Sequence, residues 1–375
     1  MGKRKRIGLI YLFDKHWLGG LYYAQNLVYA LGTLADELKP VIDVYCYNES
    51  VFEELSNVTH YPYLNINLID NFQKKRTLRN ILYFFSKKKS YNINLFKILP
   101  EDEKIFPYNW GSSSGKLIHW IPDFQDKYFP QYFSKFDLKR REESIIQTCK
   151  RGIPIVFSSN ECEKDFKKFY PKFASHQTYI VHFAVHQQDY SSIDLESILK
   201  RYNICRNYIL CANQFWEHKN HLFLFKAFKK AIDYGSNLQL VCTGSLEGSR
   251  NPEYAKSLQD FIKTNNLNDN IKLLGIIKKE ELLCLMKHSY SVVQPSLFEG
   301  WNTTVEDCKC MNKFIFLSDL NVHREQINKN VCFFNPYDEE DLAKKLCTVK
   351  PKEEYYDYSD NIRQFGMDFY SVIQQ

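Results

Sequence analysis

Residues 208–234 read YILCANQFWEHKNHLFLFKAFKKAIDY. The stretch opens with an apolar run of strand length, 208–211, and continues through a polar loop. From residue 221 to about residue 234 the apolar side chains recur at helical spacing. A strand that leads through a loop into a helix is the unit from which parallel sheets are built.

The strand-then-helix unit recurs along this part of the chain. The predicted pairs are 208–211 with 221–234, 238–242 with 252–264, 271–274 with 279–288, 291–294 with 304–311, and 314–317 with a helical turn near residue 323. Such units in succession predict a parallel sheet with helices on both faces.

The N-terminal half begins in the same way but has a less regular pattern. Its predicted elements are strands at 7–13, 41–45, 117–121 and 153–157, helical spacing over 21–31, and a helix over 137–149. Residues 50–115 mix aromatic and basic side chains without a clear period. We therefore predict an α/β chain of two Rossmann-like, doubly wound parallel-sheet domains that face each other across a cleft and meet near residue 190.

The composition narrows the class of protein. A chain of 375 residues favours two domains, and 44 % hydrophobic with 16 % aromatic residues excludes a disordered chain. The net charge of +6 is too small for the dense basic face of a nucleic-acid-binding protein. The eleven cysteines include no CxxC pair, so we expect reduced thiols rather than a disulfide framework or a zinc site.

The sequence carries no recognisable targeting or membrane-spanning segment. No apolar run approaches the roughly 18 residues of a membrane-spanning helix. The basic N-terminus leads into a short apolar stretch, 7–13, which is too short for a secretory signal. We therefore expect a cytoplasmic protein.

Ligands of doubly wound sheets bind beyond the carboxyl ends of the strands, so polar and small residues there are candidates for a site. Gly19 and Gly20 lie between a predicted strand and a helix, where peptide N–H groups can approach an anion. An ordinary flexible turn explains them equally well. They do not form a GxGxxG pattern, which argues against a dinucleotide-dependent oxidoreductase.

Two further strand ends lead into candidate loops. Lys219 is expected in or near the first turn of a helix, where the helix dipole disfavours a cation unless an anion such as phosphate binds beside it. A solvated surface lysine is the alternative. Thr243 and Gly244 follow another strand in a small-residue turn that suits a close ligand, although a plain turn also accounts for them.

The strongest candidate is the segment 295–307, PSLFEGWNTTVED. Thr303 or Thr304 is predicted to cap the following helix, whose first-turn acids would stabilise its N-terminus. Capping does not explain Glu299, which precedes the helix beside N–H groups suited to anions. A carboxylate in that place needs another partner, such as sugar hydroxyls.

These segments, in this order and spacing, resemble the retaining family 4 (group 1) glycosyltransferases of the GT-B fold. The resemblance covers most of the chain, and the segments that carry it are 213–221, 295–301, 317–319 and 323–326, with 120–125 and 128–130 similar to one bacterial branch of the family. It implies domains over 1–190 and 191–350, and a final segment, 351–375, whose helix crosses back to the N-terminal domain.

The resemblance also assigns roles to single residues. The family's paired acids correspond to Glu299, which would meet the donor hexose, and to Asp307 or its neighbour Glu306, which would bind the ribose. Lys219 would meet the diphosphate, and Ile277 lies in a turn that would contact the base. The other residues expected at the substrate site are Gly19, Gly20, His119, Gln214, Thr243, Gly244, Gly300, Trp301, Asn302, Thr303 and Thr304.

Two positions depart from the family pattern. Gln214 stands where many members have an arginine, so a neutral side chain replaces one charged contact to the diphosphate. Pro122 stands where many members have a histidine before the residue that is Asp123 here, and the nearest histidine is His119. We expect Asp123 rather than His119 to support the transition state.

The resemblance implies transfer of a hexosyl group from a GDP- or UDP-linked sugar to a saccharide hydroxyl, with retention of configuration. Its catalytic residues would be Glu299, Lys219 and Asp123. Lys219 and helix N-termini would stabilise the leaving diphosphate without a metal or other cofactor, because the motif lacks the clustered carboxylates of a Mg²⁺ or Mn²⁺ site. The alternatives are a nucleotide-sugar epimerase or phosphorylase on the same scaffold, and a non-catalytic nucleotide-sugar-binding protein.

Residues 73–89, QKKRTLRNILYFFSKKK, combine basic and bulky apolar side chains. This composition suits a helix on an anionic membrane surface, although a solvated basic helix packed by its apolar face is a comparable explanation. In the first case the acceptor would be lipid-linked, as in bacterial O-antigen or other cell-surface polysaccharide synthesis. The protein would then be peripheral at the inner face of the cytoplasmic membrane.

Overall fold

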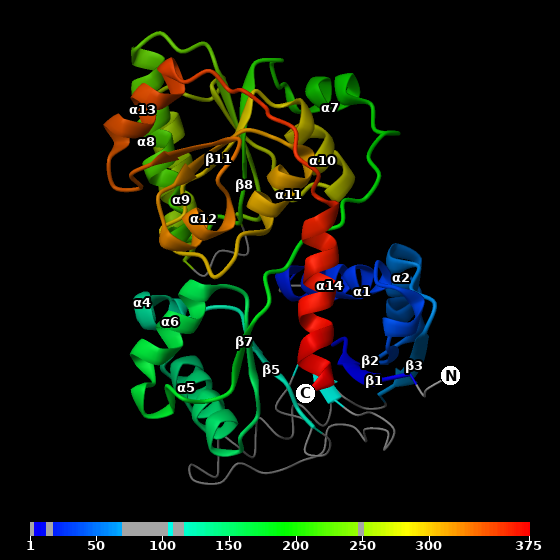
Figure 1. Cartoon of the computed structure of the whole chain (residues 1–375). Helices are drawn as coiled ribbons and strands as arrows, with labels where there is room; N and C mark the ends of the chain where they lie inside the picture. Colours follow the sequence, from blue (N-terminus) through cyan, green and yellow to red (C-terminus); the bar gives the residue numbers. More distant parts are fainter. Residues whose placement is uncertain (1–3, 13–17, 70–103, 108–115, 247–250) are drawn as a thin grey trace. The chain divides into compact units, whose positions relative to one another are not determined.

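The computed structural model describes residues 4–12, 18–69, 104–107, 116–246 and 251–375 (Figure 1). The chain forms two compact units: unit 1 is Met1–His186 with Ser359–Gln375, and unit 2 is Gln187–Tyr358. The boundaries predicted at 190 and 350 therefore lie a few residues away, after 186 and after 358. Tyr190 packs against the apolar core of unit 2, and Gln187 Nε2 donates to Asp307 O at 3.1 Å, which explains the earlier start of that unit.

Unit 2 contains a six-stranded parallel sheet in the order β10-β9-β8-β11-β12-β13. Its strands are β8 (Tyr208–Ala212), β9 (Gln239–Thr243), β10 (Ile271–Leu273), β11 (Ser291–Gln294), β12 (Ile315–Ser318) and β13 (Val331–Phe334). The chain moves outward from β8 to β10, then returns to the other side of β8 at β11. This reversal between β8 and β11 is the point at which doubly wound sheets bind their ligands.

Helices cover both faces of the unit 2 sheet. They are α7 (Leu195–Tyr202), α8 (His221–Asp233), α9 (Pro252–Thr264), α10 (Lys279–His288), α11 (Thr303–Met311), α12 (Asn321–Gln326) and α13 (Glu339–Thr348), with a 3₁₀ turn, η4 (Glu217–Lys219). Figure 1 shows α8 and α13 on one side of β8 and β11, and α10 and α11 on the other.

Two apolar clusters hold these layers together. Phe223, Phe225 and Phe228 of α8 belong to one cluster with residues of α9 and α13. The other cluster joins α7, α10 and α11 to the opposite face of the same strands. A fully buried phenylalanine stabilises the fold by about 1.5–3 kcal/mol, so α8 is firmly fixed beneath the loop that precedes it.

Unit 1 contains parallel strands in two sheets, ordered β3-β2-β1-β4 and β5-β6-β7. A parallel bridge between Ile105 and Leu117 continues the pairing from β4 towards β5. The strands are β1 (Arg6–Ile10), β2 (Val41–Cys46), β3 (Leu64–Leu68), β4 (Lys104–Phe106), β5 (His119–Ile121), β6 (Ile155–Phe157) and β7 (Thr178–Ile180).

The described helices of unit 1 include α1 and α14, which pack against each other. The α-helices are α1 (Leu18–Gly32), α2 (Glu49–Thr59), α4 (Gln125–Tyr128), α5 (Lys135–Lys150), α6 (Asn160–Phe169) and α14 (Ser359–Gln374), and the 3₁₀ turns are η1 (Asp36–Leu38), η2 (Pro130–Tyr132) and η3 (Pro171–Phe173). Gly366 brings α14 so close to α1 that an added Cβ would lie 2.5 Å from Ala30 O. The C-terminal helix therefore belongs to unit 1, whereas residues 351–358 belong to unit 2.

Several predicted elements need correction. The first strand ends at Ile10, and α1 begins at Leu18, so Gly19 and Gly20 lie inside the first turn of the helix and not in a turn before it. Three elements, α2, β3 and β4, occupy parts of the region that had no clear period. No helix in the described part of the chain combines the length and apolar character needed to cross a membrane.

Candidate functional site

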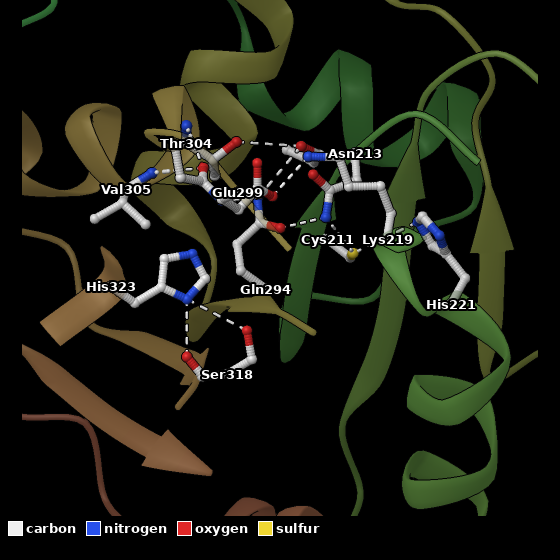
Figure 2. A network of polar contacts seen from close by, with 12 residues as sticks. Cys211, Asn213, Lys219, His221, Gln294, Glu299, Thr304, Val305, Ser318 and His323 are labelled. Atoms are coloured by element: carbon white, nitrogen blue, oxygen red, sulfur yellow. Dashed lines mark hydrogen bonds and ion pairs between the residues drawn. The ribbon is translucent and has the colours of Figure 1, made fainter. Parts of the chain in front are cut away.

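The candidate site of unit 2 is built around an ion pair at the reversal point of its sheet. Lys219 follows β8 and Glu299 follows β11, and Lys219 Nζ donates to Glu299 Oε1 at 2.6 Å (Figure 2). Their side chains are 15 % and 10 % exposed. The structure thus brings together two of the residues predicted to be catalytic.

Lys219 does not lie in a helical turn of α8. It is the last residue of η4, and Asn220 separates it from α8 with a left-handed φ of 60°. Asparagine tolerates this conformation better than most residues. The kink lets the chain turn from the 3₁₀ turn into α8, while Asn220 Nδ2 donates to Pro336 O at 3.0 Å.

The cap of α11 is Asn302, so the prediction of Thr303 or Thr304 is wrong. Asn302 Oδ1 accepts from the backbone N–H groups of Thr304 at 2.9 Å and Val305 at 3.2 Å. Its Nδ2 donates to Glu299 Oε1 at 3.1 Å. An amide side chain carries both a donor and an acceptor, so Asn302 both caps the helix and holds the carboxylate of Glu299.

Gln326 of α12 fixes Asn302 through its backbone. Gln326 Nε2 donates to Asn302 O at 2.8 Å, and Gln326 Oε1 accepts from Asn302 N at 3.1 Å. Asn302 and Thr304 are expected at the substrate site, but their backbone N–H groups are hydrogen-bonded within the protein. Gln326 lies in segment 323–326, which carries part of the family resemblance, but the sequence alone assigned no role to this residue.

The two acids of the first turns of α11 have different surroundings. Glu306 is buried, and its oxygens accept from Lys309, Gln326 and Tyr358. Asp307 is also buried, and its Oδ2 accepts from Lys279 Nζ at 2.8 Å. Lys279, the first residue of α10, was not among the predicted site residues.

Gln214 and Gly244 shape the neighbouring strand ends. Gln214 Oε1 accepts from Ser245 N at 2.9 Å, so this side chain holds the turn after β9. Gly244 has a φ of +135°, and an added Cβ would lie 2.2 Å from Asn213 O. The position therefore requires glycine, because any side chain would collide with backbone.

The remaining candidates of unit 2 lie around this frame. Thr243 is buried at the end of β9, and Gly244 N donates to Gly275 O at 2.9 Å. Ile277 is half-buried and packs against the core cluster that includes α10. The other residues are Gly300, Trp301 and Thr303, which are half-buried, and Thr304, whose Oγ1 donates to Ala212 O at 3.2 Å.

Further buried polar side chains lie close to the ion pair. Asn213 Nδ2 donates to Gln294 Oε1, which ties β8 to β11 at the reversal point. His323 Nδ1 lies 2.8 Å from Ser318 O (Figure 2). A carbonyl can only accept, so Nδ1 carries the proton. Burial lowers the pKa of His323, partly opposed by the nearby carboxylate of Glu299.

Two of the candidates in unit 1, Asp123 and His119, each have a local partner. Asp123 Oδ1 accepts from Gln125 N at 3.0 Å and pairs with Arg141 at 3.3 Å. His119 Nδ1 lies 2.8 Å from Thr148 Oγ1, and burial lowers the pKa of His119 to about 4. In α1, Gly19 is exposed and Gly20 is buried. The basic segment 73–89 lies outside the described residues.

The comparison with family models matches residues 200–364 to the family described as glycosyl transferases group 1. That range contains both members of the Lys219–Glu299 pair and the whole of α11. Most of unit 2 thus resembles the group 1 glycosyltransferases.

A curated relative gives a more distant match over part of the chain. The O-antigen chain mannosyltransferase of Salmonella typhimurium is 28 % identical over 145 residues. This match spans 38 % of the present chain and 38 % of the relative.

Solved structures resemble the whole chain in fold. A glycosyltransferase from Rickettsia africae has a TM-score of 0.61 at 14 % identity, covering 100 % of this chain and 94 % of that one. The Anabaena protein HepE, in complex with UDP and glucose, has a TM-score of 0.61 at 11 % identity, covering 99 % and 95 %. At these identities the likeness establishes the fold, and the predicted GT-B fold with its two Rossmann-like domains is confirmed.

Proposed function

We propose that this chain transfers a hexosyl group from a nucleoside diphosphate sugar to a hydroxyl of a saccharide acceptor, with retention of configuration. The observation that carries the proposal is the Lys219–Glu299 pair at the reversal point of the unit 2 sheet. A cation and a carboxylate held side by side match a donor that is anionic at its diphosphate and rich in hydroxyls at its sugar.

Lys219 is the group that meets the diphosphate in this proposal. In the free protein its ammonium pairs with Glu299 at 2.6 Å. A bound diphosphate offers the same ammonium a second anion, whose negative charge grows as the bond to the sugar breaks. A preorganised cation at that point stabilises the transition state more than the ground state. This step uses no metal in the proposal, and equal activity with and without EDTA would be the expected result.

Glu299 is the group that meets the hexose. Both internal hydrogen bonds of its carboxylate arrive at Oε1, from Lys219 and Asn302. Among the described residues none donates to Oε2, so that oxygen can accept sugar hydroxyls. We assign the ribose to Asp307 rather than Glu306, because Glu306 already accepts three internal hydrogen bonds through its two oxygens.

Two relatives bear on the choice of donor and acceptor. The curated relative's name specifies an O-antigen chain mannosyltransferase, and one structural neighbour contains UDP and glucose. We propose a GDP- or UDP-linked hexose as donor and a lipid-linked saccharide of cell-surface polysaccharide synthesis as acceptor, used at the inner face of the cytoplasmic membrane. Asp123, in unit 1, is the proposed catalytic side chain from that unit.

Thermal unfolding with a panel of UDP-, GDP-, dTDP- and CMP-sugars tests the donor assignment. A ligand present at about 100 times its Kd adds roughly 2.7 kcal/mol to the free energy of unfolding. Lys219→Ala should abolish the shift, whereas Lys229→Ala on α8, whose side chain pairs with Asp233 at the surface, should retain it. No shift with any nucleotide sugar would contradict the proposal.

A transfer assay separates the remaining functions. Incubation of the identified donor with a lipid-linked saccharide should yield a glycoside with the anomeric configuration of the donor. A donor that is converted in the absence of acceptor would instead indicate an epimerase. Binding without transfer or hydrolysis across the acceptor panel would indicate a binding protein.

A further inference from the structure

The chain enters unit 2 at Gln187 and leaves it at Tyr358, and both residues are hydrogen-bonded to helix α11. Gln187 Nε2 donates to the backbone oxygen of Asp307 at 3.1 Å. The hydroxyl of Tyr358 donates to Glu306 Oε2. Two successive residues of one helix therefore anchor both connections between the units.

The carboxylate of Glu306 is the centre of this arrangement. It is 1 % exposed, and its other oxygen accepts from Lys309 Nζ at 2.8 Å and from Gln326 Nε2 at 2.9 Å. A buried charge is expensive unless it is paired and fully hydrogen-bonded. Because Glu306 receives three donors, it is held in one position and cannot move independently of them.

The same network reaches the candidate site. Gln326 holds both backbone polar groups of Asn302, and Asn302 Nδ2 donates to Glu299 Oε1. A continuous series of hydrogen bonds therefore runs from Glu299 through Asn302, Gln326 and Glu306 to Tyr358. These residues come from a loop, two helices and the last residue of unit 2.

We propose that Glu306, Gln326 and Tyr358 are positioning residues that couple occupancy of the Lys219–Glu299 site to the connection between the two units. The units are joined after His186 and after Tyr358. Any movement of one unit against the other must therefore turn about the backbone at those two joints. The inference rests on the proposed function, because it assigns the coupling to donor binding.

The physical basis is a competition at Glu299. A donor that binds Lys219 and Glu299 competes with the hydrogen bond from Asn302 to Glu299. Gln326 bonds both Asn302 and Glu306, so a shift of Asn302 also shifts the buried carboxylate that accepts from Tyr358. A network with every member satisfied responds as a unit. Loss of the hydrogen bond between Tyr358 and Glu306 should leave donor binding unchanged. It should lower kcat, because the connection between the units is then no longer fixed to α11.

Tyr358→Phe is the most direct test, because it removes the hydroxyl and keeps the ring. The matched control is Tyr355→Phe, a tyrosine of the same segment that is 81 % exposed. We expect Tyr358→Phe to bind the donor's nucleoside diphosphate with a Kd within about twofold of the wild type, as for a site left intact. Its kcat should fall roughly three- to thirtyfold, the range of measured coupling effects.

Small-angle scattering with and without UDP or GDP gives a readout that a purely structural role would not move. The wild type and Tyr355→Phe should show the same change in radius of gyration on binding, and Tyr358→Phe a smaller one. A Tyr358→Phe protein with the wild-type kcat and scattering change would overturn the coupling. If the wild type binds no nucleotide, the proposed function fails and the coupling falls with it.

Gln326→Glu tests the middle of the network with a pH readout. The introduced carboxyl can donate to Glu306 only when it is protonated, so the loss of kcat should deepen as the pH rises. The same fractional loss at every pH, in a protein folded by circular dichroism, would argue that Gln326 only supports the fold.

Discussion

The polar residues at the strand ends of unit 2 form hydrogen bonds and ion pairs with one another, whereas the two polar candidates of unit 1 are each held by a nearby structural partner. In unit 2, Lys219 and Asn302 both donate to Glu299. In unit 1, His119 is hydrogen-bonded to Thr148, and Asp123 forms an ion pair with Arg141. A preassembled group of charges needs no reorganisation at the moment of reaction, so unit 2 is the better equipped of the two for stabilising a leaving group.

The largest expected effect on catalysis comes from removing a charged side chain in each unit. Lys219→Ala and Glu299→Ala should each reduce kcat/KM about a hundredfold or more, the typical effect of one preorganised electrostatic group. Asp123→Asn should cost about tenfold, as expected for one hydrogen bond to a charged group. Steady-state kinetics on the three folded variants measures the difference.

Two outcomes would revise the comparison. If Asp123→Asn were as damaging as Lys219→Ala, the decisive charge would lie in unit 1. If Lys229→Ala, on the exposed side of α8, were as damaging as Lys219→Ala, the effect would be one of stability rather than of the site.

Substitutions of tightly packed glycines should have the next largest effect, in this case on the free energy of unfolding. They compare how closely backbone segments pack in the two units. Gly244→Ala should lower the free energy of unfolding by about 1–3 kcal/mol, because it places a Cβ in a left-handed conformation against Asn213 O. Gly366→Ala meets Ala30 O at 2.5 Å in unit 1 without such a φ. Gly235→Ala, which has a positive φ and open space around it, is the control for backbone strain alone.

Urea unfolding of the three glycine variants separates strain from collision. If Gly244→Ala were no worse than Gly235→Ala, the close approach of β9 to the loop after β8 would be tolerant of a methyl group. Gly366→Ala tests whether the contact between α14 and α1 is equally tight.

Loss of the N-cap of α11 should have a smaller effect on stability than the glycine substitutions, but it should change stability and kcat together. Asn302→Ala should lower the free energy of unfolding by about 1 kcal/mol, the usual value for a lost N-cap, and should also reduce kcat because Glu299 loses a donor. Thr303→Ala should change stability by less than about 0.5 kcal/mol, as for a residue without such a feature. Equal effects at the two positions would contradict the assignment of Asn302 as the cap.

The elements of unit 2 were predictable because their signals are local. Helix α10 and strand β11 have the predicted bounds, since each is marked by apolar spacing within its own length. In unit 1, α2 buries only Leu55 and Thr59, and β3 is half-exposed along its length. With so little apolar burial, neither element leaves a clear period in the sequence.

The sequence predicted which residues meet at the site but not the hydrogen bonds that hold them in place. Lys219 and Glu299 follow strands that are neighbours in the sheet, so the fold alone brings them together. Besides Lys309, the side-chain partners of Glu306 and Asp307 lie 20, 52 and 28 residues away at Gln326, Tyr358 and Lys279. Three adjacent residues, 302–304, can all cap a helix, and only the loop geometry selects Asn302.

The smallest expected effect concerns His119, the first residue of strand β5 in unit 1. Burial lowers the pKa of His119 to about 4, from an ordinary value of 6.5. Between these values the unfolded chain binds a proton that the folded chain does not, so stability falls as the pH drops from about 6.5 towards 4. His119→Asn places an amide near Thr148 without a titrating group, and its free energy of unfolding should fall less over that range.

Urea unfolding of wild type and His119→Asn at pH 7 and pH 5 isolates this contribution, because every other titrating group is shared by the two proteins. An NMR titration of the wild type should find the His119 ring still neutral at pH 5, with Thr148 fixing its Nδ1. A ring that titrates near 6.5 would mean that His119 is open to water. It would then be the more available of the two unit 1 candidates for a substrate hydroxyl, ahead of Asp123, whose carboxylate is shared with Arg141.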